Sequence, residues 1–190
     1  RQAIRAQVVI DATGDAAVAA QAGAPIEHGQ YFITLVHRYG GVDTDRAIRF
    51  EIDHPAEAAT LTAEAKRLLG GAWDRWWLLT PLPGVVWCNC PHLRGYDSTS
   101  VEDLTKAEFE ARAKIEATFA FARQSVPGFE HAYLLDTAPQ MGVRQGRLLR
   151  GEYVVTADDI KESRWFPDSV ARGRSYFTPY RSLVPQRLEQ

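Results

Sequence analysis

The first hydrophobic pattern of the chain is a short apolar run followed by small residues. Residues 8–13, VVIDAT, have the composition of a buried strand. Gly14 interrupts this run, and Asp15 stands where a helix N-cap would accept hydrogen bonds from backbone N–H groups. Residues 15–22, DAAVAAQA, favour the helix that would follow, and Gly23 would end it. The pattern predicts a strand, a tight turn and a helix.

The remaining patterns predict paired strands beside helices. Strands are expected over 32–42, 75–80, 85–89, 129–137 and 143–155. Helices are expected on both sides of Pro55, the second over 56–69, then over 101–125 and, as a short helix, from 156. In the longest helix the apolar residues recur at steps of three and four, with Ser98 or Ser100 as its cap and Pro127 after its end. Strands alternate with helices only at the start of the chain. The predicted fold class is therefore α+β rather than doubly wound α/β.

Composition and charge narrow the set of partners. The 190 residues are 45% hydrophobic and 24% charged, which is typical of a globular protein with one good-sized domain or two small ones. The net charge of −2 gives no positive field to attract nucleic acid or an anionic membrane. No apolar run approaches the roughly 20 residues of a membrane helix. We therefore expect neither nucleic acid nor a membrane as the partner.

The two cysteines, Cys88 and Cys90, lie in the sequence WCNC. Residues two apart share one face of a strand, so the two thiols would point the same way. A metal site would need further ligands, and His92 is the one candidate nearby. We therefore expect no metal, and two buried or half-buried thiols in a reducing, cytoplasmic compartment.

Three of the five tryptophans fall close together in WDRWW, at Trp73, Trp76 and Trp77. We expect these side chains to pack in the core. The alternative is that they are exposed and mark an interface, in a homo-oligomer or with a complementing chain.

Familiar catalytic motifs are absent from the sequence, which contains no G-x-G-x-x-G, Walker A or G-x-S-x-G pattern. The single glycine of ATGD, between a predicted strand and helix, is a weak indication of a nucleotide site by itself. The five histidines are scattered. His92, directly after Pro91, is the most site-like of them and is our candidate substrate-binding residue.

Three arginines at steps of three lie in PQMGVRQGRLLRGEYVVT. An arginine offers a fixed fork of donors to carboxylates or phosphates. For Arg150 we favour a solvated strand edge with Glu152 and Asp158 as partners. Arg144 and Arg147 stand beside glycines that would let a ligand approach the backbone, so anion binding and a surface position remain equally open for them.

Four stretches taken together resemble a known family. In chain order they are VVIDATGDAAVAAQAGAP, NCPHLRGYDSTSVEDLTKAE, PGFEHAYLLDTAPQMGVRQGRLLRGEYVVTADDI and YRSLVP. They are similar to FAD-dependent oxidoreductases related to the fumarate reductase and succinate dehydrogenase flavoproteins. The third stretch is the most specific, because its arginines, GEY and T-x-D-D fall together.

The resemblance implies a Rossmann-type FAD domain interrupted by a mixed-sheet substrate domain with one long helix. Residues 1–27 would be the C-terminal part of the FAD domain, 28–174 the substrate or cap domain, and 175–190 a return segment. The family's G-x-G-x-x-G motif and its last FAD-contacting strand do not occur in this sequence. We therefore expect an internal fragment, inactive alone, that holds FAD poorly or not at all without the pyrophosphate cradle.

The resemblance also implies roles for individual residues. The positions expected beside the FAD cofactor are Thr13, Gly14, Asp15, Tyr180 and Arg181. Arg144 and Arg147 would be catalytic, by orienting an anionic substrate or stabilising negative charge on the reduced flavin. The implied function is flavin-mediated hydride transfer to or from a small organic substrate. The alternative is a non-catalytic, truncated or split module that binds a partner chain and does not hold FAD alone.

Overall fold

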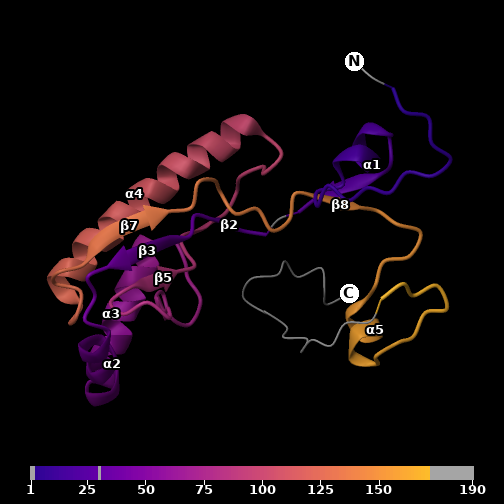
Figure 1. The fold of residues 1–190 in the computed structure, drawn as a ribbon. Helices are drawn as coiled ribbons and strands as arrows, with labels where there is room; N and C mark the ends of the chain where they lie inside the picture. Colours follow the sequence, from indigo (N-terminus) through magenta and orange to yellow (C-terminus); the bar gives the residue numbers. More distant parts are fainter. Residues whose placement is uncertain (1–2, 30, 172–190) are drawn as a thin grey trace. The chain divides into compact units, whose positions relative to one another are not determined.

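The chain forms two compact units in a computed structural model that describes residues 3–29 and 31–171 (Figure 1). Unit 1 consists of Arg1–Tyr31 and Gln145–Gln190, and unit 2 of Phe32–Arg144. The predicted return segment 175–190, with Tyr180 and Arg181, lies outside the described residues. The domain boundaries expected from the family resemblance stay a prediction.

Unit 2 is built on an antiparallel sheet of four strands. Their spatial order is β4 (Leu78–Leu79), β5 (Val86–Cys88), β3 (His37–Gly40) and β7 (Tyr133–Thr137). In this register Arg38 lies opposite both Trp87 and Asp136. A smaller antiparallel pair joins β2 (Ile33–Thr34) to β6 (His92–Leu93). The sheet expected to be mixed is thus antiparallel in every pair among the described residues.

The edge of this sheet at β7 contains a side chain that covers a neighbouring glycine. A Cβ added at Gly40 of β3 would lie 2.5 Å from the ring of Tyr133, the residue opposite it on β7. The aromatic ring therefore occupies the space that a side chain of residue 40 would fill.

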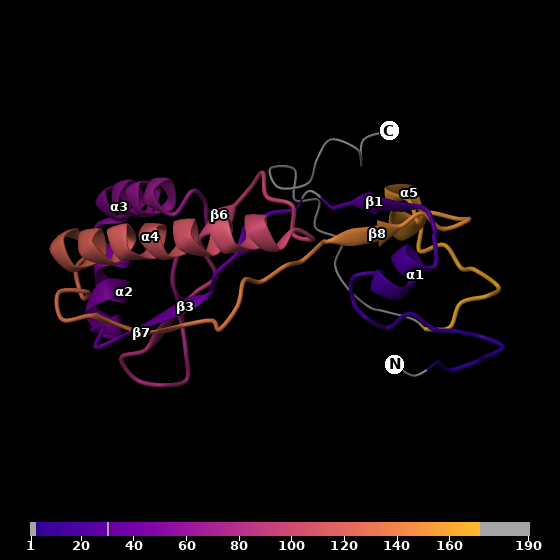
Figure 2. The same ribbon diagram turned by 90° about the horizontal axis from the view of Figure 1, so that it is seen from above.

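Three helices pack on unit 2. They are α2 (Thr44–Asp53), α3 (Pro55–Leu68) and α4 (Val101–Ser125). α4 has the bounds that the periodicity predicts, and the Ser100 hydroxyl accepts a hydrogen bond from the Asp103 N–H as its cap. Figure 2 shows α3 beside α4. The predicted apolar stripe faces inward, since Ala107, Ala111 and Ile115 are buried.

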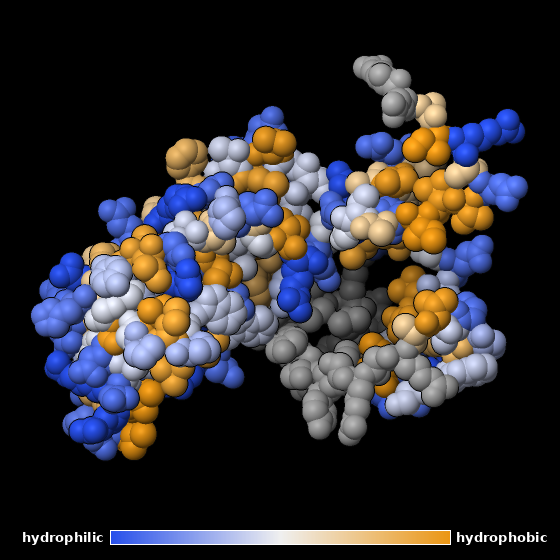
Figure 3. Space-filling model, viewed as in Figure 1, coloured by the Kyte–Doolittle hydropathy of each residue, from blue (hydrophilic) through white to orange (hydrophobic). Residues whose placement is uncertain are grey.

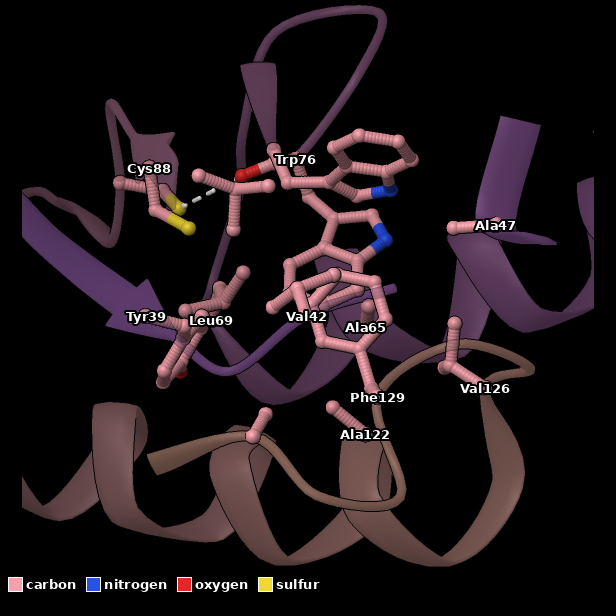
Figure 4. Close-up of a cluster of buried hydrophobic side chains, with 14 residues drawn as sticks. Tyr39, Val42, Ala47, Ala65, Leu69, Trp76, Cys88, Ala122, Val126 and Phe129 are labelled. Atoms are coloured by element: carbon pink, nitrogen blue, oxygen red, sulfur yellow. Dashed lines mark hydrogen bonds between the residues drawn. The ribbon is translucent and has the colours of Figure 1, made fainter. Parts of the chain in front are cut away.

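The main core of unit 2 is rich in aromatic rings (Figure 4). Phe129 lies at its centre, fully buried, with its ring 5.3 Å from Trp76 and 5.7 Å from Trp77 between centroids. The prediction that these two tryptophans pack in the core is confirmed. Cys88 and Cys90 are free thiols and buried, as expected, and burial raises the pKa of Cys88.

Unit 1 contains short elements with few buried residues. They are α1 (Ala17–Gln21), the antiparallel pair β1 (Ile26–His28) and β8 (Arg147–Leu149), and α5 (Ala157–Lys161). The sequence TADDI forms the predicted helix, which begins with a capping box between Thr156 and Asp159. Hydrogen bonds from Tyr153 and Thr156 hold the pKa of the Asp159 carboxyl well below its usual value.

The predicted strand over residues 8–13 is wrong. This segment has no regular secondary structure and pairs with no described strand, and Val8, Val9 and Ile10 are 77%, 70% and 85% exposed. A buried strand needs neighbours for its backbone N–H and C=O groups on both sides. Figure 3 shows hydrophobic side chains on the surface around α1 and the segment before it.

The α+β class is confirmed, because helices and small antiparallel sheets make up the described elements. Within the described residues, none of the helices has both the length and the hydrophobicity required to cross a lipid bilayer.

Gly128 lies in the loop that joins α4 to β7 and has a backbone conformation that alanine adopts only with strain. Gly128→Ala should therefore lower the free energy of unfolding by about 2 kcal/mol. Its φ is +93°, and an added Cβ would lie 2.5 Å from the Asp43 carbonyl oxygen. Urea denaturation measures the change.

Gly95 provides the matched control for this substitution. It also has a positive φ, +81°, but no atom of the described residues beyond its chain neighbours lies within 4 Å of the added Cβ. Gly95→Ala should therefore cost only the backbone strain, about 1 kcal/mol. Equal losses in the two variants would contradict the role assigned to the Asp43 carbonyl.

Candidate functional site

The turn that contains Thr13 is organised by Asp11. One carboxylate oxygen of Asp11 accepts hydrogen bonds from the Thr13 N–H, at 3.0 Å, and from the Thr13 hydroxyl, at 2.7 Å. The other accepts from the Ala19 N–H at 2.9 Å. These bonds, the Thr13 hydroxyl first among them, lower the pKa of Asp11 to about 2. Sequence reasoning missed this residue, although an Asp two positions before a Thr is a common turn signal.

Gly14 gives the turn an open backbone. Its φ is +80°, a conformation that favours glycine, and apart from its chain neighbours no described residue has an atom within 4 Å of a Cβ added there. Among the described residues, the space beside the Gly14 Cα is therefore open to another molecule.

Asp15 is not the N-cap of α1, so that prediction is wrong. The N-cap residue is Ala16, whose φ is 50° and whose side chain offers no acceptor. The acceptors for the first N–H groups of the helix come instead from Thr13, whose hydroxyl receives the Ala17 N–H at 3.0 Å, and from Asp11. The Asp15 carboxylate is directed at a residue far along the chain.

That residue is Arg147, the first residue of β8. Asp15 Oδ2 accepts a hydrogen bond from Arg147 Nη1 at 2.8 Å, and Asp15 Oδ1 accepts one from the Arg147 backbone N–H at 2.7 Å. The Arg147 and Asp15 side chains are 27% and 36% exposed. Unit 1 thus brings together one residue expected beside the cofactor and one expected to be catalytic.

The two neighbouring arginines lie in different surroundings. Arg144 is an exposed residue at the end of unit 2, shortly after Gly142, which exchanges two backbone hydrogen bonds with Thr34. Arg150 has the solvated position expected for it, with its side chain 70% exposed. Among the described residues it pairs with Glu27, at 4.0 Å, rather than with the expected Glu152 or Asp158.

His92 lies on β6 of unit 2 and is buried in an aromatic cluster. Its ring stacks on Phe32 with 3.8 Å between centroids, and Trp73 meets it edge-on at 5.5 Å. Nε2 donates to the Asn89 carbonyl oxygen at 3.0 Å, and burial lowers the pKa of His92. Its substrate-binding role stays a prediction.

A shallow pocket of about 220 Å³ lies elsewhere in unit 2, and none of the predicted site residues lines it. Arg38 and Asp136 form part of its wall, joined by two hydrogen bonds of 3.0 and 2.5 Å, so their charges compensate each other. In the part of the chain that the structure describes, no group of three or more His, Cys, Asp or Glu side chains could hold a metal ion.

A family model described as FAD dependent oxidoreductase matches residues 1–177. The chain belongs to this family. Searches of curated proteins and of solved structures found no match. The FAD-dependent oxidoreductase family expected from the sequence is confirmed, and the relation to fumarate reductase and succinate dehydrogenase flavoproteins stays a prediction. Use of FAD in an oxidoreduction is the activity that the family implies.

Proposed function

We propose that this FAD-dependent oxidoreductase carries out flavin-mediated hydride transfer to or from a small organic substrate. The observation that carries the proposal is the contact between Asp15 and Arg147. It places a candidate catalytic arginine directly against the turn that is expected to lie beside the cofactor. FAD, when bound, supplies the redox chemistry, and the protein supplies binding, orientation and electrostatics.

The residues of this turn fit one side of a flavin site. The open space at Gly14 allows a cofactor to approach the backbone closely, and the Thr13 hydroxyl has a fixed direction because it donates to Asp11. Arg147, held by Asp15, offers fixed N–H donors. Donors that need no reorganisation stabilise negative charge more effectively than mobile ones. We propose that Arg144 and Arg147 orient an anionic substrate or stabilise charge on the reduced flavin.

We also propose that residues 1–190 hold FAD only together with further polypeptide, either an extension of this chain or a complementing chain. The exposure of Val8, Val9 and Ile10 supports this, because three consecutive apolar side chains rarely remain in water without a partner. The same observation favours the second candidate function, a non-catalytic module that binds a partner chain. The two free, buried thiols support a cytoplasmic location.

The proposed function is tested by measuring bound flavin and its reduction. The protein is loaded with FAD together with the further polypeptide and mixed with small organic acids, and bleaching of the visible flavin absorbance gives the rate. Arg144→Ala and Arg147→Ala should each lower that rate by about a hundredfold, since each removes a charged donor. Their FAD content should change little.

Arg150→Ala is the matched control, because Arg150 is exposed and lies on the same segment. It should keep both the rate and the FAD content. If Arg144→Ala or Arg147→Ala lost FAD while the rate per bound flavin stayed normal, the catalytic assignment would be wrong. A protein that bound no FAD even when complemented would favour the non-catalytic module.

A further inference from the structure

Asp15 contacts two different parts of Arg147. One oxygen of its carboxylate binds the guanidinium, and the other binds the backbone N–H of the same residue. The two residues are 132 positions apart in the sequence, yet both belong to unit 1. A carboxylate that holds both the backbone and the end of one side chain restricts the rotamers that this side chain can adopt.

The residue before Arg147 is a glycine, and its lack of a side chain leaves room for the Asp15 carboxylate. A Cβ added at Gly146 would overlap Asp15 Oδ1, so any other residue there would displace the carboxylate. Gly146 is buried, and its carbonyl oxygen accepts a hydrogen bond of 2.7 Å from the Gly29 N–H. Position 146 is therefore fixed by the β1–β8 pair on one side and by Asp15 on the other.

The Asp15 side chain does not cap α1, the helix that follows it. The first N–H groups of α1 are satisfied by Thr13 and Asp11, at 3.0 and 2.9 Å. The position of the Asp15 carboxylate thus follows from Arg147 and not from helix capping.

We propose that Asp15 is a positioning residue that holds Arg147 for its work on substrate or flavin, an inference that rests on the proposed function. Arg147 has five N–H donors on its guanidinium, and Asp15 engages one nitrogen of the fork. The remaining donors keep a fixed direction toward other acceptors. Asp15 also cancels the net charge of the arginine, so an anionic group meets directed donors rather than an excess positive charge.

A double-mutant cycle tests whether Asp15 acts through Arg147. The variants are Asp15→Ala, Arg147→Ala and their combination in the FAD-loaded protein, with Arg150→Ala as control. Asp15→Ala should slow flavin reduction by roughly tenfold, from the lost orientation of a hydrogen-bonded group. The double variant should be no slower than Arg147→Ala alone. The free energies of unfolding of the wild type, the two single variants and the double variant should show the same non-additivity.

Two further variants separate positioning from a general structural effect. Gly146→Ala leaves both side chains present but displaces the carboxylate, so it should reproduce the rate of Asp15→Ala. Asp15→Asn removes the negative charge, so the midpoint potential of the bound flavin should rise, because Arg147 is then unneutralised. A purely structural role for Asp15 would leave that potential unchanged.

Two results would overturn the inference. If Asp15→Ala and Arg147→Ala slowed flavin reduction additively, or if Asp15→Ala had no effect where Arg147→Ala had one, Asp15 would not act through Arg147, and the proposed function would still stand. If Arg147→Ala itself left flavin reduction unchanged, the proposed role of Arg147 would be wrong, and the inference would fail with it.

Discussion

Phe129→Ala should lower the free energy of unfolding of unit 2 by about 3–5 kcal/mol. The Phe129 ring is fully buried and lies against Tyr39, Trp76 and Trp77, with centroid distances of 6.4, 5.3 and 5.7 Å. Its removal loses the transfer free energy of the ring and leaves a cavity between large, rigid neighbours that cannot collapse into it. Urea denaturation followed by tryptophan fluorescence measures the loss.

The chain offers a matched control for this substitution in Phe109 of α4, which is 73% exposed. Phe109→Ala removes the same atoms from a position in water and introduces a better helix former. It should change the free energy of unfolding by no more than about 0.5 kcal/mol. Similar losses in the two variants would show that Phe129 is not the centre of the core.

The buried His37 should make unit 2 less stable in mild acid. Its ring is 1% exposed, Nδ1 donates to the Cys90 carbonyl oxygen at 3.1 Å, and burial lowers the pKa of His37 to about 4. Two titratable groups lie beside it, Tyr39 on the same strand and Cys88 opposite it on β5, and both are kept neutral because burial raises their pKa values. No charge in this cluster therefore compensates a protonated imidazole.

The direction of this pH effect follows from the protonation of His37 in the folded and unfolded states. Between the unfolded value of 6.5 and the folded value of about 4, the unfolded chain binds a proton at His37 and the folded chain does not. The free energy of unfolding should therefore fall by about 3 kcal/mol as the pH drops through this window. Above pH 6.5 this contribution is fully present.

His37→Asn separates this effect from the titration of other groups. The asparagine amide can donate to the Cys90 carbonyl but does not titrate, so the variant should lose far less stability between pH 6.5 and 4 than the wild type. His131→Asn, at an exposed position, should keep the wild-type slope. The same slope in all three proteins would contradict the assignment to His37.

The elements that sequence predicts well are those whose cause is local. The helix over 101–125 follows from a repeat within its own residues and from a serine directly before it. The segment over 8–13 shows the limit, because its composition favours a strand but a strand forms only where a neighbouring strand supplies backbone partners. The residue pattern within the segment does not show whether such a neighbouring strand is present.

In the candidate site, too, locally determined features could be predicted from the sequence and long-range contacts could not. Gly14 has the positive φ that a glycine between a predicted strand and helix indicates. The partner of Asp15 could not be found locally, because a helix cap and a carboxylate paired with a distant arginine look identical in sequence. Arg147 lies 132 residues away, and only the folded unit 1 brings the two together.

Because the Tyr133 ring lies over Gly40, the residue types that are tolerated at positions 40 and 133 depend on each other. A side chain at position 40 would overlap the ring, and a small residue at position 133 would uncover the Gly40 backbone on β3, the strand next to the edge. A larger residue at position 40 therefore requires either that the Tyr133 ring rotates away or that position 133 becomes smaller. In any collection of related sequences, a bulky residue at 40 should be accompanied by a small one at 133.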